Sequence, residues 1–259
     1  MPRREKVTTL EQRGALIVTG ASRGIGAAIA KLAGKQGFQV IVNFDQSEEA
    51  AEGTVREIVA SGARARAVQA NVGREDDVLR LFEAADREFG FVEGLVNNAG
   101  ITGGFARVEA LRAAEVTEML RVNVLGTMLS CREAVKRMST ARGGRGGAIV
   151  NISSLVARTG GSNEWVHYAA SKGAVNSFTI GLAREVAAEG IRVNAVSPGL
   201  IATELHAANG APDRLERLKG TIPMHRPGTA EEVAVGVLWL MSPAASYITG
   251  TILEIGGGR

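Results

Sequence analysis

The sequence TGASRGIG at residues 19–26 decides the fold. It follows the apolar run ALIV at residues 15–18, which predicts a short buried strand, and it precedes a segment with helical spacing at residues 27–35. Glycines between a strand and a helix let the backbone approach a pyrophosphate, and the helix N-terminus offers free N–H groups. The stretch therefore predicts a dinucleotide-binding loop at the start of an α/β domain.

Predicted strands and helices alternate along the rest of the chain. This alternation indicates a doubly wound parallel sheet with right-handed crossovers, flanked by helices. No internal repeat and no interdomain linker is evident, so we expect one Rossmann domain of about seven strands over residues 14–259, after a tail at residues 1–13. The expected strands are 15–18, 38–43, 65–70, 94–96, 147–152, 191–196 and 248–254, and the expected helices are 27–35, 47–60, 74–89, 113–139, 168–188 and 229–240.

Composition and charge argue against several classes of protein. The net charge is only +3, and the basic loop at residues 142–145 is short, so we expect no nucleic-acid partner. No run of about 18 apolar residues occurs, and the N-terminus has no apolar signal region, so we expect no membrane partner. The single cysteine, Cys131, excludes an intramolecular disulfide and is typical of a cytoplasmic protein. We interpret it as a buried structural thiol.

Tyr168 and Lys172 lie four residues apart in a segment that favours a helix, so both side chains should lie on one face. A free phenol has a pKa near ~10, and a neighbouring cation lowers that pKa by stabilising the phenolate. The pair could pass a proton to or from a substrate oxygen. Taken alone, the same spacing also fits ordinary packing and an ordinary surface charge.

Two residues give conflicting signals about the cofactor. Asp45 follows the second strand, where a carboxylate can hydrogen-bond a ribose 2′-hydroxyl and favour NAD. Arg23 in the glycine loop can instead neutralise a 2′-phosphate and favour NADP. Asp45 also fits a simple helix cap before residues 47–60.

Other polar residues follow the later strands. Ser153 and Ser154 end the fifth strand, and the turn SPG at residues 197–199 ends the sixth, where ligands bind in open α/β sheets. Asn123 lies inside an apolar helical run and needs partners, either structural or for a proton-relay water. Residues 203–221 are polar and prone to form helix, and we interpret them as a lid or as a plain surface helix.

Over residues 14–258 these motifs, in this order, resemble the classical short-chain dehydrogenases/reductases. TGASRGIG is similar to the family's TGxxxGxG loop, NNAG at residues 97–100 matches its NNAG motif, and YITG at residues 247–250 resembles its C-terminal motif. The resemblance implies a catalytic tetrad, which falls on Asn123, Ser154, Tyr168 and Lys172. It also implies cofactor contacts, which fall on Gly20, Ser22, Arg23, Gly24, Ile25, Gly26, Phe44, Asp45, Asn71, Val72, Asn98, Ala99, Gly100, Tyr168, Lys172, Pro198, Gly199, Ile201 and Thr203.

The sequence departs from the family pattern at three points. The usual serine-to-tyrosine spacing is one residue shorter than that from Ser154 to Tyr168, and we expect the extra residue in the loop at residues 158–165. The family pattern usually assigns the second of two adjacent serines, which favours Ser154, with Ser153 as the second candidate. Asn71 stands where many members have aspartate, and we expect it still to bind adenine. The acidic position typical of NAD-specific members is Phe44, so Arg23 favours NADP(H), with NAD(H) as the alternative.

The resemblance implies an oxidoreductase that transfers a hydride between NADP(H) and a secondary alcohol or ketone, with no metal. Tyr168 would act as the general acid or base, Lys172 would lower its pKa and bind the nicotinamide ribose, Ser154 would bind the substrate oxygen, and Asn123 would hold a water. A cofactor-binding sensor or scaffold without turnover is the alternative. The family also implies a homotetramer built on helices at residues 113–139 and 163–188. We expect the substrate pocket to include Ile101, Gly103, Gly104, Val156, Trp165, His167 and Gly199.

Overall fold

The computed structural model describes residues 13–204 and 210–259, and in these residues seven strands form one sheet. The strand order is β3-β2-β1-β4-β5-β6-β7, and each neighbouring pair runs parallel. The strand order changes direction between β1 and β4. The connections that follow these two strands therefore lead to opposite sides, and they leave a crevice at the carboxyl ends of β1 and β4. The predicted doubly wound Rossmann fold is confirmed. The strands are β1 Ala15–Val18, β2 Gln39–Phe44, β3 Ala65–Gln69, β4 Val92–Asn97, β5 Gly147–Ile152, β6 Ile191–Pro198 and β7 Ile252–Ile255.

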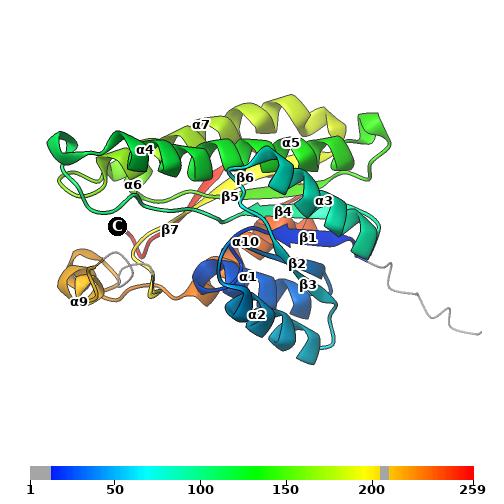
Figure 1. Cartoon of the computed structure of the whole chain (residues 1–259), viewed down its shortest axis with the longest axis horizontal. Helices are drawn as coiled ribbons and strands as arrows, with labels where there is room; N and C mark the ends of the chain where they lie inside the picture. The colour runs from blue at the N-terminus through cyan, green and yellow to red at the C-terminus, as the bar shows by residue number, and fades with distance from the viewer. Residues whose placement is uncertain (1–12, 205–209) are drawn as a thin grey trace, which may run out of the picture.

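Helices cover both faces of the sheet (Figure 1). On one face lie α1 Gly24–Lys35, α2 Glu48–Ala60 and α10 Ala230–Met241, and on the other lie α3 Glu75–Phe89, α4 Ala113–Leu120, α5 Gly126–Met138 and α7 Val166–Val186. The strands are buried on both sides, so each face contributes its own apolar core. The short helical segments are α6 Val156–Thr159, α9 Arg214–Leu218, a π-helix η2 Arg121–Leu125, and the 3-10 turns η1 Val108–Ala110, η3 Thr140–Arg142, η4 Ala187–Glu189, η5 Lys219–Thr221 and η6 Pro243–Ala245.

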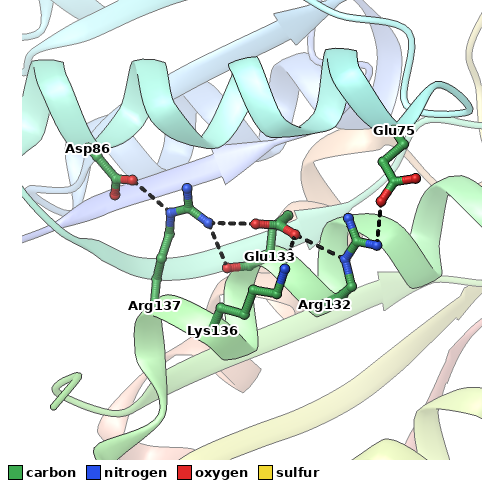
Figure 2. A network of polar contacts seen from close by, with 6 residues as sticks. All are labelled: Glu75, Asp86, Arg132, Glu133, Lys136 and Arg137. Atoms are coloured by element: carbon green, nitrogen blue, oxygen red, sulfur yellow. Dashed lines mark hydrogen bonds and ion pairs between the residues drawn. The ribbon is translucent and has the colours of Figure 1, made fainter. Parts of the chain in front are cut away.

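A network of charged side chains joins α3 to α5 (Figure 2). The buried carboxylate of Glu133 accepts hydrogen bonds from Arg132, Lys136 and Arg137 at 2.9–3.0 Å, and Arg137 also reaches Asp86 on α3 at 2.7 Å. Burial acts to raise the pKa of Glu133, but these three cations outweigh it and lower the pKa. The network fixes α5 against α3 on the outer side of the sheet.

Several predicted bounds differ from the observed ones, and two of the differences are large. The helix predicted at residues 113–139 is divided into α4, the π-helix η2 and α5, because one wider turn is inserted around Asn123. The last strand begins at Ile252 rather than at residue 248. Gly250 has a φ of +78°, which turns the chain before the strand starts. A capping box of Thr229 and Glu232 is present at the start of α10.

Candidate active site

The glycine loop between β1 and α1 is built around close backbone contacts. Gly20 has a φ of +61°, and a Cβ on it would lie 2.9 Å from Ala99 Cα. A Cβ on Gly26 would lie 2.3 Å from the Gly20 carbonyl oxygen and 2.5 Å from Asn98 Nδ2. Helix α1 starts at Gly24 with no acidic residue in its first turn and no side-chain cap. Its first N–H groups therefore stay available to an anionic group.

Polar side chains beneath the loop hold it in place. Asn43 Oδ1 accepts a hydrogen bond from Gly20 N at 3.2 Å, and its amide nitrogen donates to Ala70 O at 3.0 Å. Thr19 Oγ1 accepts from the backbone nitrogens of Asn98 and Ala99 at 2.9 and 3.0 Å. The sequence reading missed the roles of Thr19 and Asn43, although each is a buried polar residue at the carboxyl end of a strand. A polar residue at the carboxyl end of a predicted strand is the feature of the sequence that could have indicated these roles.

Tyr168, Lys172 and Ser154 come together at the carboxyl end of β5. Helix α7 carries Tyr168 and Lys172 one turn apart, and Ser154 follows β5. The Ser154 hydroxyl hydrogen-bonds the Tyr168 phenol. The Lys172 ammonium is buried, donates to Ile152 O at 2.7 Å and lies 5.7 Å from the centre of the Tyr168 ring. Ser153 points elsewhere, because its hydroxyl donates to Lys172 O at 3.2 Å.

Burial controls the pKa values of both groups. Burial raises the pKa of Tyr168 to about 12, and the hydrogen bond with Ser154 offsets part of that rise. Burial lowers the pKa of Lys172 to about 8. The net shift of the Tyr168 pKa is upward because desolvation of the phenolate is the largest effect. That Lys172 lowers this pKa stays a prediction. The phenol stays protonated at neutral pH.

Asn123 anchors the loop that follows β4. Its Oδ1 accepts from Ile101 N at 2.9 Å, and its amide nitrogen donates to Ile101 O at 2.8 Å and to Ser171 Oγ at 3.1 Å. A Cβ on Gly100 would lie 3.2 Å from Asn123 Oδ1 and 3.5 Å from Lys172 Nζ. The fully buried Asn123 thus lies beside Lys172, with Gly100 packed closely against both.

One cavity of about 740 Å³ runs from the glycine loop to Tyr168. Its size suits a nucleotide and a small substrate together. All the predicted catalytic and cofactor-binding residues line it except Gly26 and Asn123, which lie behind its wall. The cavity-lining residues among the predictions are Gly20, Ser22, Arg23, Gly24, Ile25, Phe44, Asp45, Asn71, Val72, Asn98, Ala99, Gly100, Ser154, Tyr168, Lys172, Pro198, Gly199, Ile201 and Thr203.

Arg23 and Asp45 both line this cavity. Both are exposed, and the Arg23 guanidinium is 4.0 Å from Glu204, which makes at most a weak ion pair. Asp45 Oδ2 accepts from Asn71 Nδ2 at 3.1 Å. Asn71 therefore holds the carboxylate of Asp45, whereas the exposed guanidinium of Arg23 has only a weak ion pair with Glu204.

The predicted substrate wall is right in part. Ile101, Val156, Trp165 and Gly199 line the cavity, but Gly103, Gly104 and His167 do not. His167 directly precedes Tyr168 on α7, so it points about 100° away around the helix axis. It is buried against Gly103 instead, where a Cβ would lie 3.2 Å from the imidazole.

Further residues line the cavity from segments in which the sequence analysis named few individual site residues. Glu164 precedes α7, and Arg214 comes from α9 within the region predicted as a lid. Thr203 and Glu204 line the same cavity. Residues 205–209 of the predicted lid lie outside the described residues. A charge pair between distant segments leaves no local periodicity, so the sequence carried no signal for the Glu164–Arg214 contact.

Cys131 belongs to a buried polar cluster below the site. Its sulfur accepts from Asn97 Nδ2 at 3.2 Å, and Asn97 also donates to Asn151 Oδ1 at 2.9 Å. Burial raises the pKa of the Cys131 thiol to about 12. The thiol is therefore unreactive, and the structural interpretation of this residue is confirmed.

Two kinds of feature are absent from residues 13–204 and 210–259. No helix there has the length and apolarity needed to cross a bilayer. No group of three or more histidine, cysteine, aspartate or glutamate side chains is arranged to hold a metal ion among these same residues.

Comparisons with known proteins agree with this geometry. A family profile described as enoyl-(acyl carrier protein) reductase matches residues 20–259. The chain is 49% identical over 243 residues to the uncharacterized oxidoreductase YgfF of Escherichia coli K12, covering 94% of this chain and 98% of that protein. It is 39% identical to 3beta-hydroxysteroid dehydrogenase 1 of Eggerthella lenta, covering 94% and 92% of the two chains.

A solved structure shares the fold. The crystal structure of a short-chain dehydrogenase from Burkholderia cenocepacia J2315, in complex with NADP, superposes with a TM-score of 0.88 at 34% identity and covers 96% of this chain and 98% of that one. The chain belongs to the short-chain dehydrogenase/reductase family of oxidoreductases.

Proposed function

We propose that this protein is an NADP(H)-dependent reductase that interconverts a ketone and a secondary alcohol. One observation carries the proposal: a phenol hydrogen-bonded to Ser154 lies in the same cavity as the glycine loop. A nucleotide held by the loop would therefore end beside a group that can protonate an oxygen. The family assignment makes hydride chemistry the expected class.

The residues present fit a dinucleotide. Positive φ angles at Gly20 and Gly24, and the uncapped start of α1, leave a backbone cradle for a pyrophosphate. Arg23 would face a 2′-phosphate, whereas Asp45 is engaged by Asn71. The NADP in the Burkholderia relative supports the same choice, with NAD(H) as the alternative. When bound, the nicotinamide cofactor supplies or accepts the hydride.

Tyr168 would act as the general acid in reduction. Its high pKa keeps the proton on the phenol at neutral pH, ready for transfer to the carbonyl oxygen as the hydride adds to the carbonyl carbon. Ser154 would hydrogen-bond the same oxygen and stabilise its developing negative charge. Lys172 would then stabilise the phenolate left behind and bind the nicotinamide ribose. Because burial disfavours the phenolate, Tyr168 holds the proton that the reduction of a ketone requires.

Asn123 would act as a positioning residue. Its side chain holds the backbone of Ile101 and the hydroxyl of Ser171, next to Lys172. The role of Asn123 in holding a water that connects Lys172 to solvent stays a prediction.

The oligomer and the location complete the proposal. We infer a homotetramer, because the outer layer of α4, η2, α5 and α7 exposes the apolar side chains of Leu120, Leu125, Met128 and Val166.

We infer a cytoplasmic location from the single, buried cysteine, which forms no disulfide.

The test is a fluorescence titration of the purified protein with NADPH and with NADH, followed by a panel of ketones. The proposal predicts tighter binding of NADPH and ketone-dependent oxidation of NADPH. Tighter binding of NADH would mean that Asp45 sets the cofactor choice. Cofactor binding without turnover of any ketone would favour the sensor or scaffold alternative.

A further inference from the structure

A buried ion pair joins α9 to the wall of the cavity. Arg214 is the first residue of α9, and its side chain is only 6% exposed. Its two terminal nitrogens each lie 2.7 Å from one carboxylate oxygen of Glu164. This two-point arrangement is the strongest and most directional pairing available to an arginine. It therefore fixes both the position and the orientation of α9 at this point.

The same guanidinium contacts an aromatic pair. The Arg214 Cζ lies 4.6 Å from the centre of the Trp165 ring and 5.2 Å from that of Phe105. Trp165 and Phe105 stack with their centres 4.5 Å apart. Trp165 also meets the Tyr168 ring edge-on, with centres 5.7 Å apart. A continuous series of contacts thus leads from α9 to the phenol.

The backbone makes this wall rigid. Trp165 is the N-cap residue of α7, so its position determines where the helix carrying Tyr168 begins. Ala106 N donates to Glu164 O at 3.0 Å, and Ala106 pairs with Trp165 in an isolated parallel bridge. Glu164 and Trp165 are therefore held on one side by the segment around Phe105 and on the other by Arg214.

Glu164 also compensates the positive charge of this region. Its hydrogen bond with Arg214 is the main reason that its pKa is lowered, and Arg217 and Arg259 act in the same direction through space. The carboxylate is therefore ionised at neutral pH. It engages the guanidinium that would otherwise offer two donors to an anionic substrate.

We propose that the Glu164–Arg214 pair determines substrate specificity, by fastening α9 against Trp165 and giving the cavity an aromatic, charge-compensated wall beside Tyr168. This wall favours a ketone whose neighbouring group is apolar and uncharged, such as an aryl or alicyclic ring. The inference rests on the proposed ketone reduction, but the contact between Arg214 and Trp165 does not.

The contact can be tested without catalysis. The chain has two tryptophans, and Trp239 lies half exposed on α10, away from the cavity. In a Trp239→Phe background, Arg214→Met should move the Trp165 emission to longer wavelength and make it accessible to acrylamide. Glu164→Gln, which keeps the shape of the side chain, should cause a smaller change in the same direction. Unchanged emission and quenching in both folded variants would overturn the proposal.

Specificity is tested with two ketones that differ by one carboxylate, acetophenone and 4-acetylbenzoate. The wild-type protein should have the higher kcat/KM for acetophenone. Glu164→Gln leaves the guanidinium uncompensated, so it should shift the ratio of the two kcat/KM values toward 4-acetylbenzoate by about tenfold. The affinity for NADPH should not change. A wild-type preference for 4-acetylbenzoate, or an unchanged ratio in the variant, would overturn the proposal.

The two experiments separate this inference from the proposed function. If no ketone is reduced by any form of the protein while Arg214→Met still alters the Trp165 emission, ketone reduction fails and the fastening of α9 stands. If the ketones are reduced and neither variant changes emission or specificity, ketone reduction stands and the specificity role fails.

Discussion

At the scale of single residues, the environment of the phenol matters more than its spacing from the lysine. The i, i+4 spacing correctly places Tyr168 and Lys172 on one face of α7. It carries no information about burial, which dominates both pKa values. The structure also separates the two adjacent serines, because Ser154 bonds the phenol while Ser153 bonds the α7 backbone.

The two serines give a matched pair of variants. Ser154→Ala removes the hydroxyl that contacts the phenol, so kcat for ketone reduction should fall by about 10²-fold or more. Ser153→Ala removes one buried hydrogen bond and should cost about 1 kcal/mol of stability with little change in kcat. Steady-state kinetics and urea unfolding of both variants check this. A larger loss of kcat in Ser153→Ala would assign the role to Ser153.

The buried lysine predicts a pH-dependent stability. The pKa of Lys172 is about 8 in the folded protein and ~10.4 when unfolded, so the unfolded state binds more protons between these values. Below pH 8 the charged lysine destabilises the fold, and the penalty disappears as the pH rises toward 10. Lys172→Met should therefore stabilise the protein at pH 7 by about 1–2 kcal/mol, after the lost hydrogen bond to Ile152 O is subtracted.

Urea unfolding at pH 7 and at pH 9.5 measures this difference. The gain of Lys172→Met over the wild-type protein should shrink at the higher pH. An equal difference at both pH values would mean that Lys172 is not desolvated as described.

At the scale of elements, the glycine loop was the most predictable part of the site. The apolar run at residues 15–18 and TGASRGIG at residues 19–26 predict a strand, a tight turn and a helix start, and all three form, with the helix starting at Gly24 instead of residue 27. The π-helix at Asn123 was not predictable, because one inserted residue leaves the apolar pattern of residues 113–139 almost unchanged. The start of β7 was misplaced because apolar residues precede the turn at Gly250.

Gly26 tests the close packing of this loop. Gly26→Ala would bring a methyl group to within 2.3 Å of the Gly20 carbonyl oxygen, so the loop must move. We expect at least about a tenfold loss of NADPH affinity and a loss of about 1–3 kcal/mol of stability. Gly53→Ala in α2 is the control: its nearest neighbour would be an arginine nitrogen at 3.7 Å, and it should stabilise the helix by about 0.5–1 kcal/mol. Equal behaviour of the two variants would contradict the packing of the loop.

At the scale of the whole molecule, the sequence predicted the sheet because parallel strands buried on both faces give distinct apolar runs. It could not predict how segments distant in the sequence meet. Arg214 and Glu164 are fifty residues apart, and only the fold brings them into one wall. The residues that line the cavity near the glycine loop can be predicted from local motifs. Those that line it near the proposed substrate depend on such long-range contacts, which the sequence does not show.

The tetramer is also a prediction at this scale. Sedimentation should give four times the 27.1 kDa of one chain. Leu125, 45% exposed on η2, should lie in an interface, so Leu125→Asp should lower the assembled mass. Val59→Asp is the matched control, because Val59 is 51% exposed on α2 on the opposite face of the sheet. Identical masses for the wild-type protein and Leu125→Asp would exclude this surface as an interface.

The most direct test of the whole account is the turnover of Tyr168→Phe with saturating NADPH and ketone, measured beside its NADPH affinity. Removing the phenolic hydroxyl deletes the proposed acid while the ring still packs against Trp165. The account predicts a loss of kcat of about 10²–10⁴-fold with NADPH affinity nearly unchanged. Turnover close to that of the wild-type protein would contradict the assignment of Tyr168 as the general acid.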